Sequence, residues 1–439
     1  MVHGVEVTAE AAGLAARRLA LAALEHVFER GRPVDEFLDG DEGVAALDPR
    51  DRAFLLALVQ SVFRHKGEIE ENLSAYLSKP LPRKSGAASL ILLSSVAQLR
   101  YLAMAPHAVI DMAVRLAKAD RNATHFSGLI NAVLRKVATG PDAVKPGAGV
   151  ATPEWLWGRW AKDYGPDVAN AIATANASEA ALDLTVKDDP AAWSAQLGGM
   201  VLPTGSVRID HPKGPVTALP GFAEGAWWVQ DAAAAIPARL VGDVTGLRVL
   251  DLCAAPGGKT LQLAAAGGRV TAVDQSVARL TRLHENLRRT GLTAAVVTAD
   301  VLGFAPDELF DCVLLDAPCS ATGTLRRHPD LLYLKSTAQI GALVQLQRRM
   351  LAQAVRLVKP GGTLVYCTCS LDSAEGEGQI ARLLTDEPKV QVKAISPGEA
   401  GLPAHLITRQ GFFRSLPHLP LGASAGLDGF FAARLTKTF

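Results

Sequence analysis

The stretch Val-Leu-Asp-Leu-Cys-Ala-Ala-Pro-Gly-Gly-Lys-Thr at positions 249–260 decides the fold of this 439-residue chain. Arg248–Leu252 is an apolar run typical of a buried strand, and the glycines after it lead into a helix from Lys259. Glycine lets a ligand approach the backbone, and the free N–H groups at a helix start favour anionic groups. The spacing is neither the G-x-G-x-x-G dinucleotide fingerprint nor a P-loop. We therefore expect a ligand-binding turn of another kind.

The segments after this turn continue to alternate between strand and helix. Further strands are expected at 269–273, 294–297, 312–315 and 363–367, and helices at 276–289 and 337–358. Apolar strands that alternate with helices form a mostly parallel sheet covered on both faces. Residues 239–439 are therefore expected to form a Rossmann-like α/β domain, with its ligand beyond the carboxyl ends of the strands.

Carboxylates stand where two of these strands end. Asp274 ends the second strand, where a carboxylate can accept both hydroxyls of a ribose. Asp300 follows the third strand, where it can contact an adenine edge. A glycine turn and two acidic strand ends together suit a nucleoside cofactor. The alternative is that each aspartate only caps a helix.

Two further strands end in cysteine motifs. Asp316-Ala317-Pro318-Cys319 follows the fourth strand, and Thr368-Cys369 follows the fifth. One helical crossover joins these strands, so we expect parallel neighbours about 4.8 Å apart with both cysteines at the cofactor end of the sheet. The other cysteines are interpreted as buried structural residues: Cys253, Cys312 and Cys367.

The cysteine distribution also bears on location and metal binding. No cysteine precedes Cys253, which leaves no disulfide framework and favours a reducing cytoplasm. Cys367-Thr368-Cys369 lacks the C-x-x-C spacing and the histidine partners of a zinc site, so no metal is expected. We expect no signal peptide and no membrane span, since no stretch approaches about 18 uninterrupted apolar residues. Because the net charge is +1, any nucleic-acid surface must be local.

The front of the chain, residues 1–140, lacks the alternation and is expected to be all-helical. Asp48 and Pro49 match an N-cap followed by proline at the first helical position. A helix from Ser127 carries apolar residues at helical spacing. Short turns between such segments indicate a compact helical bundle.

Residues 141–238 differ in composition from the segments on either side. A stretch rich in proline and glycine at 141–153 is expected to be a linker. All six tryptophans follow it, among strand-like runs at 182–186 and 207–209. We expect a small α/β connector domain here, and three domains in all.

The motif that opens the α/β domain is specific enough to suggest a family. DLCAAPGGKT (251–260) resembles the cofactor motif of the RNA cytosine-C5 methyltransferases of the RsmB, Sun or Fmu type. The resemblance covers nearly the whole chain. It includes a NusB-like helical domain through PHAVIDMAVRLAK (106–118) and GLINAVLRKV (128–137), then ALPGFAEGAWWVQDAAA (218–234), GFFRSLPH (411–418) and LDGFFAARL (427–435).

This resemblance implies S-adenosyl-L-methionine as the cofactor and RNA, specifically bacterial 16S rRNA, as the substrate. It implies a NusB-like RNA-binding domain at 1–140 and a methyltransferase domain at 239–439. We expect a cytoplasmic monomer. The family's cofactor contacts carry over to Cys253, Ala254, Ala255, Pro256, Gly257, Gly258, Lys259, Asp274, Asp300 and Asp316.

The chemistry of this family explains the need for cysteine. A pyrimidine C5 carbon is a poor nucleophile until a thiolate adds to C6 and converts the ring to an enamine. Cysteine suits this step because its thiolate is both a strong nucleophile and a good leaving group. In the family the Thr-Cys cysteine attacks and the Pro-Cys cysteine assists product release, which implies attack by Cys369 and assistance by Cys319. DNA cytosine-C5 methyltransferases attack with a Pro-Cys cysteine, so Cys319 alone would leave the choice open.

Two more residues complete the expected catalytic set. Asp316 is the best candidate to protonate or hydrogen-bond N3 of the base as charge builds on the ring. Lys259 is expected to orient Asp316 or the substrate. The alternative is a solvated lysine in the first turn of a helix, which the positive end of the helix disfavours.

The substrate side is predicted from SATGTLRRHPDLLY (320–333), which resembles the family segment after the Pro-Cys motif. Arg326, Arg327 and His328 are expected to form a basic loop that contacts RNA phosphate. The alternative is a solvated surface cluster. A base in structured RNA must leave its stack to reach a thiolate, so the pocket should accept an extruded nucleotide.

The sequence departs from the family pattern in three places. Ala321 replaces a glycine after the Pro-Cys motif, Lys187 ends a Leu-Thr-Val-Lys run where the family has Leu-Arg-Val-Asn, and Gly376 replaces an asparagine between two glutamates. The second change removes an arginine expected at the RNA or interdomain surface. None of them touches the two cysteines or the aspartate of the catalytic set.

Three other functions are compatible with the sequence. The first is a methyltransferase that acts on transfer RNA, large-subunit RNA or DNA. The second is a catalytically inactive RNA-binding or antitermination factor, which the intact catalytic set argues against. The third is a small-molecule methyltransferase, in which the helical front domain would have no purpose.

Overall fold

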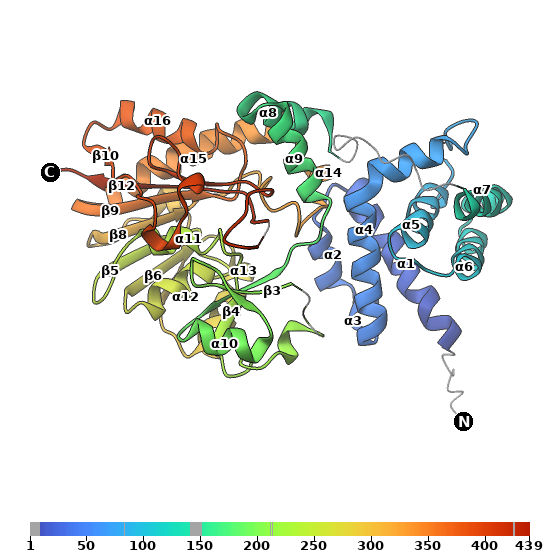
Figure 1. Cartoon of the computed structure of the whole chain (residues 1–439), viewed down its shortest axis with the longest axis horizontal. Helices are drawn as coiled ribbons and strands as arrows, with labels where there is room; N and C mark the ends of the chain where they lie inside the picture. The colour runs from blue at the N-terminus through green and yellow to red at the C-terminus, as the bar shows by residue number, and fades with distance from the viewer. Residues whose placement is uncertain (1–8, 83, 141–151, 211, 213, 425) are drawn as a thin grey trace. The chain divides into compact units, whose positions relative to one another are not determined.

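The structure, a computed structural model, describes residues 9–82, 84–140, 152–210, 212, 214–424 and 426–439 (Figure 1). It divides into two compact units. The first extends to Gly158 and includes Ala169–Ala177 and His328–Lys335, whereas the second comprises Arg159–Val168, Ser178–Arg327 and Ser336–Phe439. The expected linker at 141–153 falls mostly outside the described residues.

The first unit is helical. Its N-terminal elements are α1 (Ala9–Phe28), α2 (Val34–Gly40), α3 (Glu42–Ala45), α4 (Pro49–Ser74), α5 (Ala88–Arg100), α6 (Pro106–Ala119), η1 (Ala123–Phe126) and α7 (Ser127–Thr139). The predicted cap of α4 is confirmed, because the Asp48 carboxylate accepts hydrogen bonds from the N–H groups of Arg50 and Asp51, each at 2.9 Å. The predicted apolar face of α7 is buried in the core of the unit: Ile130, Val133, Leu134 and Val137.

A short segment that is distant in sequence completes this helical unit. It contains α14 (Leu331–Leu334). The Tyr333 hydroxyl donates a hydrogen bond to the Phe63 carbonyl at 2.8 Å, and the Tyr333 ring lies edge-on to Phe28 with centroids 5.1 Å apart. The Asp330 carboxylate accepts a hydrogen bond from the Val34 N–H at 3.2 Å. The chain between two strands of the α/β domain is therefore part of the helical core.

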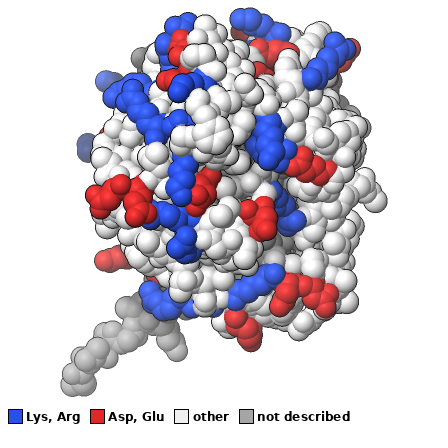
Figure 2. All heavy atoms as spheres, turned by 90° about the vertical axis from the view of Figure 1, so that its left-hand side faces the viewer, with Lys and Arg blue, Asp and Glu red and all other residues white. Residues whose placement is uncertain are grey.

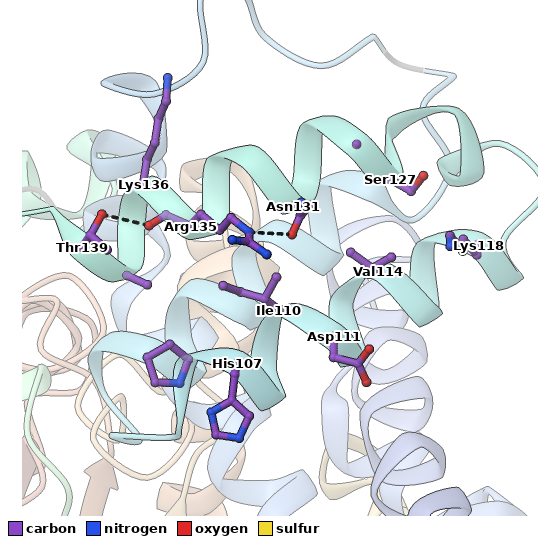
Figure 3. Close-up of a pocket in the computed structure, with 13 residues that line it drawn as sticks. His107, Ile110, Asp111, Val114, Lys118, Ser127, Asn131, Arg135, Lys136 and Thr139 are labelled. Carbon is purple, nitrogen blue, oxygen red and sulfur yellow. Dashed lines mark hydrogen bonds between the residues drawn. The ribbon is translucent and has the colours of Figure 1, made fainter.

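A groove of about 880 Å³ lies along α6 and α7 (Figure 3). Three exposed cationic side chains line it: Lys118, Arg135 and Lys136. The acidic residue that lines it, Asp111, pairs with Arg115 at 2.8 Å, so its charge is already neutralised. The groove therefore carries a net positive charge.

The second unit contains two sheets, of which the smaller lies in the connector. Its helices are α8 (Glu154–Tyr164) and α9 (Pro166–Asn176), shared with the first unit, and α10 (Pro190–Leu197). Its strands β1 (Leu182–Val186), β2 (Met200–Val201), β3 (Val207–Ile209) and β4 (Trp227–Val229) pair antiparallel in the order β2-β3-β1-β4. The two predicted strands are confirmed as β1 and β3. The connector shares one compact unit with the α/β sheet.

The larger sheet has the order β10-β12-β9-β8-β5-β6-β7, with β11 paired to β12. Its strands are β5 (Arg248–Leu252), β6 (Arg269–Asp274), β7 (Ala295–Thr298), β8 (Phe310–Asp316), β9 (Val358–Thr368), β10 (Val390–Val392), β11 (Phe413–Ser415) and β12 (Phe430–Lys437). Strands β5 to β9 run parallel and β10 to β12 pair antiparallel. The predicted mostly parallel sheet is confirmed.

Helices cover both faces of this sheet. They are α11 (Ile236–Leu240), α12 (Gly258–Ala265), α13 (Val277–Thr290), α15 (Thr337–Leu357) and α16 (Glu377–Asp386). Short 3-10 turns occur at Val301–Gly303, Glu399–Gly401 and Ala404–Leu406, and in the connector at Val216–Ala218. Leu351 of α15 and Ile380 of α16 pack in one core with Tyr366 of β9. Leu263 of α12 packs in the core of the opposite face. One predicted boundary differs substantially. Strand β9 begins at Val358, before the two glycines that were expected to precede it, and a register shift in its pairing with β8 accommodates them.

Candidate active site

The cofactor turn joins β5 to α12, and neighbouring side chains pack closely against its glycines. Gly257 has a φ of +110°, and a Cβ there would lie 2.3 Å from Leu283 Cδ1 of α13. A Cβ on Gly258 would lie 3.3 Å from the Gln230 side chain. The sequence predicts that these glycines admit a ligand. The structure adds a second reason, which is that neighbouring side chains pack directly against the turn.

A cavity of about 330 Å³ lies at the carboxyl ends of the parallel strands. Its lining includes six of the predicted site residues: Cys253, Asp274, Asp300, Asp316, Cys319 and Cys369. The other predicted cofactor contacts, 254–259, form the turn next to the cavity and do not line it. Sequence reasoning missed Gln275, Arg279, Leu346 and Met350. Gln275 directly follows a predicted residue, whereas nothing in α15 marks which of its apolar residues face a cavity.

Asp274 and Asp300 hold different positions in this cavity. Asp274 is buried, and its carboxylate accepts hydrogen bonds from the N–H groups of Ala255 at 3.2 Å and Ser276 at 2.9 Å. Asp300 is exposed and caps the turn Val301–Gly303 by accepting from the Leu302 N–H at 3.0 Å. Asp300 therefore both caps this turn and lines the cavity.

The two predicted catalytic thiols converge. Strands β8 and β9 are parallel neighbours, with Asp316 opposite Cys367, and the loops beyond them bring Cys319 Sγ to 3.4 Å from Cys369 Sγ. The expected juxtaposition is confirmed. The hydrogen bond to Cys369 and burial raise the pKa of the Cys319 thiol well above its ordinary value. Two sulfurs this close do not both carry a negative charge, so the pair holds at most one thiolate.

Lys259 points into the protein and not into solvent. Its ammonium donates a hydrogen bond to Asp316 Oδ2 at 2.7 Å, and Cys367 Sγ donates to Asp316 Oδ1 at 3.4 Å. Burial acts to lower the pKa of Lys259, but the charge and hydrogen bond of Asp316, together with nearby Cys367 and Asp251, raise that pKa overall. The alternative of a solvated lysine is wrong, because the residue is 8% exposed. Lys259 fixes the Asp316 carboxylate at the edge of the cavity.

The predicted basic loop is largely buried. Arg326 is 4% exposed. Arg327 donates hydrogen bonds to Asp231 at 2.8 Å and to Asp428 at 3.1 Å. His328 is half-exposed and belongs to the helical unit. The prediction of one solvent-facing basic loop is therefore wrong, because buried carboxylates already neutralise Arg327.

Arg327 belongs to a buried charge network that reaches the connector sheet. Arg208 of β3 and Asp183 of β1 are fully buried and form a bidentate pair at 2.6 and 2.7 Å. Arg208 also donates to the Gly426 carbonyl at 2.8 Å, close in sequence to Asp428. Burial and the charge of the neighbouring Asp231 raise the pKa of Asp428 to about 7. These charges are mutually dependent, because each is removed from water.

We predict that Arg327→Ala lowers the free energy of unfolding by about 3–5 kcal/mol, because it leaves two buried carboxylates without their shared cation. Urea denaturation followed by tryptophan fluorescence measures the change. The control is Arg382→Ala, which breaks a surface pair with Asp386 at 3.1 Å and should cost less than about 1 kcal/mol. Equal losses of unfolding free energy in the two variants would contradict this structural role of Arg327. A loss of RNA affinity with unchanged stability would indicate that Arg327 contacts RNA.

The cavity suits a nucleoside, and two of its carboxylates are already ion-paired: Asp274 with Arg279 at 3.6 Å and Asp316 with Lys259 at 2.7 Å. Asp274, Asp300 and Asp316 supply carboxylates, and Leu346 and Met350 supply an apolar wall. Within the described residues, no three His, Cys, Asp or Glu side chains are grouped as metal ligands. In the same part of the chain, every helix is too short or too polar to cross a bilayer.

Solved structures share this architecture. The crystal structure of PH0851 gives a TM-score of 0.74 at 24% sequence identity, over 97% of this chain and 98% of that one. The crystal structure of NSun6 from Pyrococcus horikoshii with SFG gives a TM-score of 0.52 at 21% identity, over 65% and 98% of the two chains. These similarities support the fold.

Sequence comparisons identify the family. The model described as 16S rRNA methyltransferase RsmB/F matches residues 242–436, and the NusB family model matches 14–139. Ribosomal RNA small subunit methyltransferase B of Sodalis glossinidius is 36% identical over 447 residues, which cover 96% of this chain and 97% of that protein. The protein of the same name from Vibrio cholerae is 33% identical over 446 residues, with 96% and 97% covered. Fold and site thus define an S-adenosylmethionine-dependent methyltransferase. The chain belongs to the RsmB/F family of 16S rRNA methyltransferases.

Proposed function

We propose that this enzyme transfers a methyl group from S-adenosylmethionine to C5 of a cytosine in bacterial 16S rRNA, through a covalent bond between Cys369 and C6. The observation that carries the proposal is the 3.4 Å separation of two thiols that line one cavity with three carboxylates. A metal-free methylation of an already nucleophilic atom would need neither thiol. Addition to a pyrimidine ring and later elimination use both.

The residues have distinct roles in the proposed reaction. Cys369 adds to C6, which makes C5 the nucleophile, and the bound cofactor supplies the electrophilic methyl group. The proton that N3 of the base takes up as charge develops on the ring comes from the Lys259–Asp316 pair, in which the ammonium is the donor and the carboxylate passes the proton on. Loss of the C5 proton, assisted by Cys319, then breaks the bond to C6 and returns the Cys369 thiolate.

The substrate is proposed from the relatives, which are named as enzymes of the small ribosomal subunit RNA. Bacterial ribosomal RNA is made in the cytoplasm, where we therefore place the enzyme. To test this, full-length protein and tritium-labelled cofactor are incubated with transcripts of 16S rRNA, 23S rRNA and transfer RNA, and with DNA. Nuclease digestion should yield labelled 5-methylcytidine from 16S rRNA. Label in another base or another nucleic acid would contradict the proposal, and no label from any of them would favour a non-enzymatic RNA-binding factor.

We also propose that the helical unit contacts RNA through the groove along α6 and α7. Lys118, Arg135 and Lys136 give this groove a net positive charge, since Asp111 is paired within it (Figure 3). On the face of the molecule drawn in Figure 2, by contrast, basic side chains are interspersed with acidic ones. A concentration of cations favours a phosphate backbone.

We predict that the double substitution Arg135→Glu/Lys136→Glu raises the KM for 16S rRNA about tenfold or more and leaves kcat unchanged, because it repels phosphate far from the reacting atoms. The logarithmic dependence of affinity on salt should also become less steep. Arg50→Glu/Arg52→Glu is the matched control, since both residues are exposed on α4 and do not line the groove. An equal rise in KM for the control would indicate general electrostatic attraction, with no role specific to the groove.

A further inference from the structure

Glu375 is a fully buried carboxylate that bonds to both cysteine loops. Its Oε1 accepts hydrogen bonds from the Ser320 N–H at 3.0 Å and from Gln347 Nε2 at 2.8 Å. Its Oε2 accepts hydrogen bonds from the hydroxyls of Ser320 and Ser370, each at 2.5 Å. Each serine directly follows one of the two cysteines. One side chain therefore holds the residue next to each thiol.

Further hydrogen bonds join the two loops around this carboxylate. The hydroxyl oxygens of Ser320 and Ser370 lie 3.1 Å apart, although the two residues are separated by 50 positions in the chain. The Gly323 N–H donates to the Cys369 carbonyl at 2.9 Å, and the Leu371 N–H donates to a hydroxyl of the first loop at 3.0 Å. The loops thus form one hydrogen-bonded layer beneath the thiols.

The two acceptor oxygens of Glu375 explain how one side chain can organise this layer. A buried carboxylate is tolerated only when its oxygens are hydrogen-bonded, and here all four donors are neutral groups. The hydroxyls of Ser320 and Ser370 both donate to the same oxygen of Glu375, so this carboxylate holds both loops close together.

We propose that Glu375 is a positioning residue for methyl transfer. It fixes the Cys319 and Cys369 loops so that their sulfurs stay within reach of one pyrimidine ring. This inference rests on the proposed function for its consequence, but the geometric claim can be tested without RNA. Glu375 bonds to the serines and acts on the sulfurs only through them.

The geometric test is the rate at which dibromobimane cross-links the two thiols and becomes fluorescent. In a background in which Cys253, Cys312 and Cys367 are replaced by serine, the cross-link reports only the remaining pair. We expect Glu375→Ala to lower the cross-linking rate about tenfold or more, because the buried serines lose their common acceptor. Glu375→Gln keeps one acceptor oxygen and should give an intermediate rate.

A matched control separates positioning from a general loss of stability. Leu383→Ala removes a buried side chain from α16, the helix that follows Glu375 in the chain, without touching either loop. It should lower the melting temperature and leave cross-linking unchanged. In the wild-type background, Glu375→Ala should lower kcat about 100-fold with a much smaller change in KM for RNA, as expected for a misplacement of reacting groups.

Each outcome decides the proposal. Wild-type cross-linking in Glu375→Ala, or an equal loss in Leu383→Ala, would overturn it. Should Glu375→Ala not fold, Ser320→Ala and Ser370→Ala each remove one of the two hydroxyl contacts, and unchanged cross-linking in both would also overturn it. If the wild-type protein methylates no cytosine but Glu375→Ala still loses cross-linking, the proposed function fails while the positioning role stands.

Discussion

Cys369→Ala is expected to abolish methyl transfer to RNA, with kcat reduced by about 10⁴-fold or more. In the proposed reaction, the thiolate of Cys369 makes C5 nucleophilic, and no second group at that position supplies this activation. The neighbouring Cys319 lies 3.4 Å away, but the hydrogen bond to Cys369 and burial raise the pKa of its thiol, which disfavours its thiolate form. Tritium transfer to 16S rRNA measures the loss, and equilibrium dialysis with labelled cofactor checks that the cavity still binds it.

The control for this variant is Cys312→Ala. Cys312 is buried on β8 and does not line the cavity, so its substitution should retain the wild-type kcat even if stability falls. If Cys369→Ala instead accumulates a covalent complex with RNA, the roles of the two cysteines are reversed and Cys319 is the attacking residue. Methylation at an undiminished rate would exclude a covalent mechanism through Cys369.

The arrangement of the site was largely predictable because it depends on strand ends. Each apolar run of the α/β domain is local in sequence, and parallel strands place all their carboxyl ends at one edge of a sheet. Asp274, Asp316 and Cys369 therefore meet in one cavity although up to 95 positions separate them. The β8–α15–β9 crossover makes the cysteine-bearing strands neighbours, as the rule for short connections predicts.

The basic loop was not predictable in the same way. A pair of arginines beside a cavity suggests phosphate binding, since arginine is usually exposed. The partners of Arg327 are Asp231 and Asp428, which lie 96 and 101 positions away in the chain. No local pattern relates these three residues. Their pairing depends on how the connector and the C-terminal loop fold against the sheet.

The docking of α14 into the helical unit was missed for a related reason. The residues after Arg327 resemble a family segment that we interpret as part of the substrate side. Tyr333 instead packs against Phe28 and Phe63, about 270 to 305 positions earlier. An aromatic residue in a short helical turn gives no indication of which core it will join. Glu375 was likewise visible only as part of a family motif until its four hydrogen bonds were known.

Cys319→Ala is expected to have the opposite effect from loss of the nucleophile: a covalent protein–RNA complex should accumulate. Attack by Cys369 does not require Cys319, so the bond to C6 still forms. Release requires loss of the C5 proton, and without the assisting thiol this step should slow by about 100-fold or more. The complex should appear as a band of reduced mobility on a denaturing gel with labelled 16S rRNA, and nuclease treatment should remove the shift.

The double variant Cys319→Ala/Cys369→Ala distinguishes this complex from other attachments. If Cys369 forms the bond, the double variant gives no complex, whereas attachment through any other residue persists. The yield should also depend on the cofactor, because elimination of the product becomes limiting only after the methyl group has been transferred. A Cys319→Ala enzyme that turns over at the wild-type rate without a detectable complex would leave the short distance between the two sulfurs without a catalytic role, and would direct attention to Asp316 and Lys259 as the groups that assist release.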